Sequence, residues 1–127
     1  MKKLFLAIAL LALPAAAQEE GEELFQTFCA TCHGVDARGE GPMAALLTVP
    51  PTDLTGLTAS HGGEFPTFQV VRRIDGRDPL LAHGGPMPVW GGFFEGDGGA
   101  LREETGQPIL TSSAIADLVR WLQSVQE

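Results

Sequence analysis

The stretch CATCH, residues 29–33, contains both cysteines of this 127-residue chain and one of its three histidines. It follows an acidic run in which Leu24, Phe25 and Phe28 recur at helical spacing. The glutamates of that run favour the positive end of a helix dipole, so they mark a helix start. The sequence therefore predicts a helix from about residue 20 to residue 29, with the Cys/His motif at its end.

Three interpretations compete for Cys29, Cys32 and His33. A C-x-x-C pair is typical of a disulfide or a thioredoxin-like redox site, but thioredoxin-like motifs accompany βαβ patterns and the sequence has none. A zinc site needs two further ligands, and the only other imidazoles are those of His61 and His83. In covalent haem c attachment each thiol adds to one haem vinyl group, and the next residue directs its imidazole at the iron. We favour this third interpretation, with thiol redox chemistry as the main alternative.

An iron bound by His33 has a second axial position, which is either filled or open. Met87 lies in the segment GGPMPVWGG between two prolines, which stiffen the backbone and remove amide donors. A thioether on so stiff a loop can approach an iron repeatably, so we predict Met87 as the distal ligand and His83 as the runner-up. Met43 is expected to fill core space on a short apolar helix, and His61 is expected to lie in a loop.

Two short helices are predicted in the middle of the chain. One spans residues 43–47 and is stopped by Pro50-Pro51. The other spans residues 66–75 and ends at Gly76, a residue type that commonly caps helix C-termini.

The last predicted helix is the clearest. It begins at Ser112 or Ser113, either of which can cap it, and its apolar residues form a stripe at helical spacing. Before it, a long glycine-rich loop is expected from residue 77 to about residue 110. No part of the chain has sustained strand alternation, so the predicted fold class is all-α, with about four helices.

The N-terminus has the pattern of a secretory signal peptide. Two lysines precede ten apolar residues, Leu4 to Leu13, and an A-x-A site follows at residues 15–17. Ten apolar residues are too few to cross a bilayer, which needs about 20. We expect a cleaved signal peptide over residues 1–17, a mature domain over residues 18–127, export to the periplasm and no stable membrane insertion.

Cleavage would make the chain more acidic. The whole chain has a net charge of −8, and both lysines lie in residues 1–17, so residues 18–127 carry six arginines against sixteen acidic residues, a net charge of −10. Phosphate recognition needs basic patches, so no nucleic-acid partner is expected. An acidic surface predicts a partner with a basic docking face, and association that slows as salt rises.

Several motifs occur in a fixed order along the chain. They are CATCHG at residues 29–34, GEGP at 39–42, PPTDLT at 50–55, MPVWG at 87–91, and a final helix containing Leu118-x-x-Trp121. In this combination the sequence resembles a monohaem class I cytochrome c of the bacterial periplasm. The resemblance implies that about four helices wrap around one covalently attached haem.

The resemblance also implies a role for each matching residue. Cys29 and Cys32 form the thioethers, His33 is the proximal iron ligand and Met87 is the distal one. A carbonyl of the Pro50-Pro51 pair is expected to accept a hydrogen bond from the second nitrogen of His33 and fix the ring.

Further residues are expected around the haem and behind it. Trp90 packs beside the haem, with its N–H in reach of a propionate. Gly21 and Phe25 meet Leu118 and Trp121 where the first and last helices cross. Three arginines are candidates to pair with the haem propionates: Arg72, Arg73 and Arg77. We expect at least two of the three to be solvated instead.

The implied function is one-electron transfer between redox proteins. Imidazole and thioether ligands favour ferrous iron, and six-coordinate iron has no vacancy for a substrate. No other catalytic motif is visible, so an enzyme is not expected. The alternatives are a haem subunit of a larger oxidoreductase complex and a ligand-binding or sensing haem protein. Residues 92–111 form a longer connection than many relatives have, and they are expected to cover a haem edge, form a docking surface or remain a mobile loop.

Overall fold

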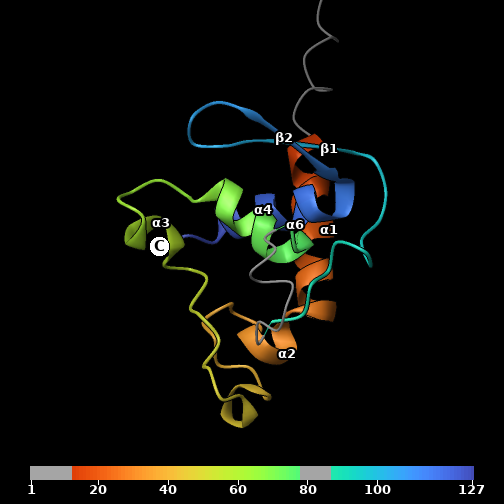
Figure 1. The fold of residues 1–127 in the computed structure, drawn as a ribbon. Coiled ribbons are helices and arrows are strands. Elements are labelled where there is room, and N and C mark those ends of the chain that lie inside the picture. Colours follow the sequence, from red (N-terminus) through yellow and green to blue (C-terminus); the bar gives the residue numbers. More distant parts are fainter. Residues whose placement is uncertain (1–12, 78–86) are drawn as a thin grey trace, which may run out of the picture.

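The structure is a computed structural model that describes residues 13–77 and 87–127. These residues form five α-helices, one 3-10 helix and one β-hairpin (Figure 1). In chain order the elements are α1 (Leu13–Phe28), α2 (Ala30–His33), the 3-10 helix η1 (Ala44–Leu46), α3 (Leu57–Ser60), α4 (Thr67–Asp75), β1 (Gly98–Arg102), β2 (Pro108–Ser112) and α6 (Ser113–Ser124).

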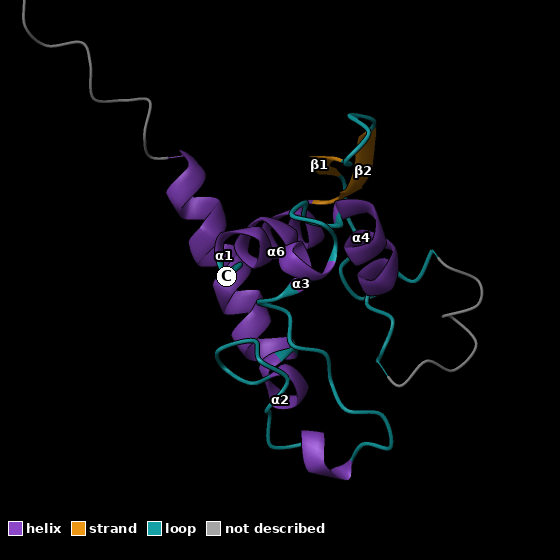
Figure 2. Cartoon of the chain, turned by 90° about the vertical axis from the view of Figure 1, so that its left-hand side faces the viewer, coloured by secondary structure: helices purple, strands orange, loops and turns teal. Residues whose placement is uncertain are grey.

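Helices α1 and α6 cross closely and form the most extensive contact between two elements in the described part of the chain (Figure 2). The Phe25 and Trp121 rings lie 4.4 Å apart between their centroids. A Cβ on Gly21 would lie 2.8 Å from the Cβ of Trp121 and overlap the carbonyl of Asp117, so only glycine lets the helices approach this far. Leu118 is 2% exposed. The predicted meeting of the first and last helices is confirmed.

Helix α1 begins earlier than predicted, at Leu13 instead of residue 20. Pro14 suits the first turn of a helix because no amide hydrogen is needed there, and the alanines that follow have the highest helix propensity. The helix therefore runs through residues 17 and 18, where signal-peptide cleavage is predicted.

The other long helices agree with the sequence pattern. Helix α4 ends at Gly76, which adopts the left-handed conformation (φ 76°). Ser112 caps α6, because its side chain accepts a hydrogen bond from the Ile115 amide at 3.3 Å. The four-residue helix α3 was not predicted, since one turn is too short to give a periodic pattern.

The expectation of no strands is wrong, because β1 and β2 pair as an antiparallel hairpin with Ala100 opposite Leu110. Alternation is present in β2, where Ile109 is buried and Leu110 is exposed. Strand β1 begins Gly98-Gly99-Ala100, residue types that are depleted in strands and hide its pattern. The predicted loop after residue 77 therefore contains regular structure.

The hairpin and the loops around η1 lie at opposite ends of the molecule (Figures 1 and 2). The chain end returns to α3, where the Glu127 amide donates to the Thr55 carbonyl at 3.0 Å. Met43 precedes η1 and is 39% exposed, so its predicted role as core filler is wrong. Within residues 13–77 and 87–127, no helix is long and apolar enough to cross a membrane.

Candidate functional site

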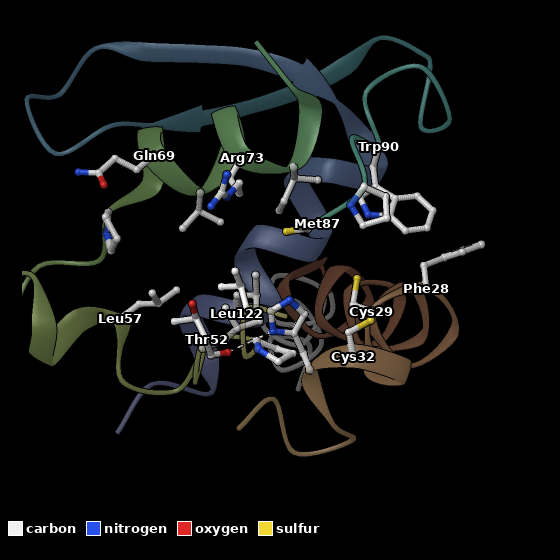
Figure 3. Close-up of a pocket in the computed structure, with 18 of the residues that line it drawn as sticks. Phe28, Cys29, Cys32, Thr52, Leu57, Gln69, Arg73, Met87, Trp90 and Leu122 are labelled. Atoms are coloured by element: carbon white, nitrogen blue, oxygen red, sulfur yellow. Dashed lines mark hydrogen bonds between the residues drawn. The ribbon is translucent and has the colours of Figure 1, made fainter. Parts of the chain in front are cut away.

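The Cys/His motif lies at the junction of α1 and α2. The Cys29 amide donates to the Phe25 carbonyl at 2.8 Å, and the Cys29 carbonyl accepts from the amides of Cys32 at 3.1 Å and His33 at 2.9 Å. The chain thus makes one further turn, which brings both sulfurs to the same side (Figure 3). The two cysteines do not form a disulfide.

These three side chains open into a cavity of about 420 Å³. This volume falls in the range of cofactor and ligand pockets, about 300–1,000 Å³. Most of its lining is apolar. The lining residues include Phe28, Leu47, Val49, Pro50, Pro51, Leu54, Leu57, Pro66, Val70, Ile74, Met87, Pro88, Trp90 and Leu122.

His33 is held by a backbone carbonyl. Its Nδ1 lies 3.2 Å from the Thr52 carbonyl oxygen, and since a carbonyl only accepts, Nδ1 carries the hydrogen and Nε2 keeps its lone pair. Burial lowers the pKa of the imidazole, while the Thr52 hydrogen bond partly raises it. A neutral ring with a free Nε2 is the form that binds a metal.

The acceptor differs from the predicted one. His33 contacts the carbonyl of Thr52, not that of Pro50 or Pro51. The Pro51 carbonyl instead faces Gly39, so closely that a Cβ on Gly39 would overlap it. Pro51 still lines the cavity, so its place in the site is that of a wall.

The GEGP segment fastens the loop after the motif onto α2. The amides of Gly39, Gly41 and Met43 donate to the carbonyls of His33, Cys32 and Thr31 at 2.7, 3.1 and 3.0 Å. A Cβ on Gly41 would lie 2.6 Å from the Ala30 carbonyl, which explains the glycine. The segment therefore satisfies helix carbonyls that would otherwise lack partners.

Met87 and Trp90 approach the cavity from another part of the chain. Figure 3 shows Met87 between the cysteine pair and Arg73, with Trp90 on the far side of Met87 from Arg73 and Gln69. Trp90 packs in an aromatic cluster whose ring centroids lie 5.1–5.7 Å apart, made of Phe28, Trp90, Phe93 and Phe94.

Comparison with known proteins identifies the chain. Residues 18–126 match the family Cytochrome c. The chain belongs to the cytochrome c family. No curated protein and no solved structure matches this cytochrome.

Family membership defines the cofactor and its general role. The cytochrome has covalently attached haem c, with iron, and works in haem-based electron transfer. The cavity suits such a group, since two cysteines outside any disulfide, an imidazole with a free Nε2 and a thioether line one apolar space. The mostly helical fold, with its small two-stranded sheet, agrees with the family.

The cysteine chemistry of this cytochrome does not favour thiol redox. Burial, and secondarily the neighbouring Cys32, raise the pKa of Cys29 to about 11. Redox-active cysteines have lowered pKa values, because the thiolate is the nucleophile. In the described parts of the chain, no group of three or more His, Cys, Asp or Glu residues is placed to hold a metal ion.

Of the three candidate arginines, only Arg73 lines the cavity. Arg72 lies over the Phe68 ring, with 5.2 Å from the guanidinium carbon to the ring centroid. Arg77 forms an ion pair with Asp75. Figure 3 places Arg73 and Gln69 on the side of the cavity away from both cysteines. Haem propionates lie opposite the vinyl groups, so this is the end where a carboxylate partner is useful.

Sequence reasoning missed some lining residues. His61 lines the cavity from the end of α3, although it was expected to be an ordinary loop residue. Its Nδ1 lies 2.8 Å from the Leu57 carbonyl, the i−4 spacing that a short helix supplies. Gln69 precedes Arg73 by four positions, so both side chains lie on the same face of the predicted helix. The sequence therefore could have indicated that Gln69 lies near any site that Arg73 lines. His83, the alternative distal ligand, lies outside the described residues.

Proposed function

We propose that this cytochrome c is a one-electron carrier whose haem is attached through Cys29 and Cys32. In this proposal His33 is the proximal iron ligand and Met87 is the distal one. The observation that supports it best is that both thiols, the imidazole and the thioether line one cavity, although Met87 is 54 positions from His33 in the sequence.

The surrounding residues orient each proposed iron ligand. The Thr52 carbonyl fixes the His33 ring and leaves Nε2 free, and burial favours the neutral imidazole. Pro88 stiffens the backbone beside Met87. The haem supplies an iron that accepts and releases one electron. Imidazole and thioether together favour the reduced state, and with both present no position remains open for a substrate. The role of a carrier, not an enzyme, follows.

Export and partner choice complete the proposal. Residues 1–17 would direct the chain to the periplasm and be removed, leaving residues 18–127 with a net charge of −10. Such a surface attracts a redox protein with a basic docking face. The bimolecular electron-transfer rate with a cationic partner should fall as salt screens the attraction, and a rate that is constant or rises with salt would contradict this part.

The ligand assignment is tested with the haem-loaded protein as wild type, Met87→Ala and Met43→Ala. Met43 is the matched control, because it is an exposed methionine of the same chain. We expect Met87→Ala alone to lose the red charge-transfer band of thioether-ligated ferric haem and to bind carbon monoxide readily when reduced. An unchanged band in Met87→Ala would refute the assignment. Carbon monoxide binding by the wild type would favour the ligand-sensing alternative.

A further inference from the structure

Residues 89–91, which follow Met87 after Pro88, pack against the last turn of α4 and its cap Gly76. The Trp90 amide donates to the Ile74 carbonyl at 2.7 Å. A Cβ on Gly91 would lie 3.0 Å from the carbonyl carbon of Asp75 and overlap its oxygen. A Cβ on Gly76 would overlap the Val89 side chain. The C-terminus of α4 is thus the platform for the segment that contains Met87.

Arg77 contacts the last residue of α4, Asp75, from the protein surface. The Arg77 amide donates to Asp75 Oδ1 at 3.0 Å, and Arg77 Nε lies 2.6 Å from Asp75 Oδ2. The second contact is an ion pair and not an aligned hydrogen bond, and the Asp75 side chain is only 6% exposed. Arg77 therefore places a cation beside a nearly buried carboxylate, and removing it would weaken the electrostatic compensation of that charge.

The same guanidinium reaches the hairpin. Arg77 Nη2 donates to the Leu110 carbonyl at 2.6 Å, on β2. Arg77 therefore connects the residues under the Met87 segment to the β1–β2 hairpin.

We propose that Arg77 is a positioning residue for Met87. By holding Asp75 and the Leu110 carbonyl together, it keeps the end of α4 and residues 89–91 in place, and so determines how strongly the thioether holds the distal iron position. This inference rests on the proposed Met87 ligation.

The hairpin supplies a matched control. Arg120 Nη2 donates to the Ala100 carbonyl at 2.9 Å, and its Nη1 pairs with Asp117 at 2.7 Å. Ala100 and Leu110 are directly opposed in the hairpin register. Arg120 thus makes the same pair of contacts as Arg77, but it ties the hairpin to α6 and not to the end of α4.

The test compares haem-loaded wild type, Arg77→Gln, Arg77→Lys and Arg120→Gln. The readouts are the thioether charge-transfer band and the affinity of the ferric protein for added imidazole, which competes for the distal position. We expect Arg77→Gln to bind imidazole about tenfold more tightly and to lose part of the band, as loss of a supporting partner typically costs a ligand about that factor. Arg77→Lys keeps the charge beside Asp75 and should fall between Arg77→Gln and the wild type. Arg120→Gln should stay within about twofold of the wild type.

Equal effects of Arg77→Gln and Arg120→Gln would overturn the inference, because they would reduce Arg77 to a general anchor of the hairpin. If Arg77→Gln does not fold, Arg77→Lys against Arg120→Gln decides in the same way. Met87→Ala in the same assay separates the two proposals. If it leaves the band and the imidazole affinity unchanged, the ligation itself fails; if it changes both while the arginine variants do not differ, only the role of Arg77 fails.

Discussion

The α1–α6 crossing and the haem side, residues 29–61 with 87–94, are built on different principles. In the crossing the chain fills its own core, with Phe25 at 1% and Val119 at 0% exposure. On the haem side the chain surrounds a cavity, and apolar residues next to it remain open, such as Val49 at 53% exposure. The comparison shows that side chains alone fill the core at the crossing, whereas on the haem side the side chains surround the space for the cofactor.

The difference has an energetic consequence. Apolar surface removed from water stabilises a fold by about 25 cal/mol per Å². In the crossing this stabilisation is already present in the folded chain. On the haem side part of it depends on the flat cofactor, because mostly apolar side chains line a cavity of about 420 Å³ that such a group suits. The two regions should therefore respond differently to the same kind of change.

The largest effect is expected from replacing both cysteines, Cys29→Ala with Cys32→Ala. Without thioethers the haem is no longer covalent, so mass spectrometry of the denatured protein should find the chain without the added mass of haem. Hydrogen exchange should then accelerate strongly in residues 34–56, while the amides of α1 and α6 keep more of their protection.

Two outcomes would contradict this prediction. Covalent haem in the double variant would contradict the attachment sites. Equal loss of protection in α6 and in residues 34–56 would contradict the division into two regions, since it would mean that the crossing also depends on the haem.

A change in the crossing should act on stability and not on the haem. Gly21→Ala gains about 1 kcal/mol of helix propensity but forces a methyl group into the Asp117 carbonyl, and such overpacking costs about 1–3 kcal/mol. A backbone carbonyl inside a helix cannot move aside, so we expect a net loss of up to about 2 kcal/mol in urea unfolding, with an unchanged haem spectrum in the folded protein.

Gly92→Ala is the control for that substitution. No atom lies within 4 Å of a Cβ built on Gly92, so the free energy of unfolding should change by less than about 0.5 kcal/mol. A large effect at Gly92, or none at Gly21, would show that close helix approach does not limit the crossing.

The two regions also differ in how much of them the sequence could predict. In the crossing, the apolar stripe of α6 follows from helical periodicity, because neighbours i, i+3 and i+4 are local, and its cap follows from the serine residue type. The contact of α6 with Phe25 was implied only by the family resemblance, because it joins residues far apart in the sequence. On the haem side, the motif residues could be named but their partners could not. The Thr52 carbonyl is one residue away from the predicted acceptor, and backbone direction within PPTDLT depends on the packing of Gly39 against Pro51.

The hairpin and the arginine contacts could not be predicted from local sequence patterns. The pairing of Gly98–Arg102 with Pro108–Ser112 depends on contacts across a turn. Strand β1 is so rich in glycine that its sequence has no recognisable strand pattern. The separate roles of Arg72 and Arg73 depend on the rotation of α4 against the cavity, which sets Arg73 toward it, while Arg77 lies beyond the end of that helix. Three arginines within six positions look alike until that rotation is known.

A smaller effect is expected at the cap of α6. Ser112→Ala removes the acceptor for the Ile115 amide and should cost about 1 kcal/mol in the free energy of unfolding. Ser113→Ala is the matched control, because Ser113 is exposed and already inside the helix, where alanine is favourable. The two serines were equivalent candidates in the sequence, so equal losses would contradict the assigned cap.

The smallest effect, and the one confined to the haem side, is expected at Asp53. Hydrogen bonds from the Thr55 hydroxyl at 2.7 Å and the Thr55 amide at 2.9 Å lower the pKa of this carboxyl. A carboxyl with a lowered folded-state pKa stabilises the fold above its unfolded pKa, and that contribution is lost as pH falls through the folded value. Asp53→Asn keeps an oxygen acceptor but removes the charge, so it should be slightly less stable than the wild type at neutral pH.

The pH dependence distinguishes this role from a merely steric one. Urea unfolding of both proteins from pH 7 down through the acid range should give curves that converge, because a protonated Asp53 and a neutral asparagine are electrostatically alike. A difference that stays constant with pH would mean that the charge does not matter. Because Asp53 is adjacent to Thr52, whose carbonyl holds His33, a change in the haem spectrum that also vanishes at low pH would link this turn to the iron ligand.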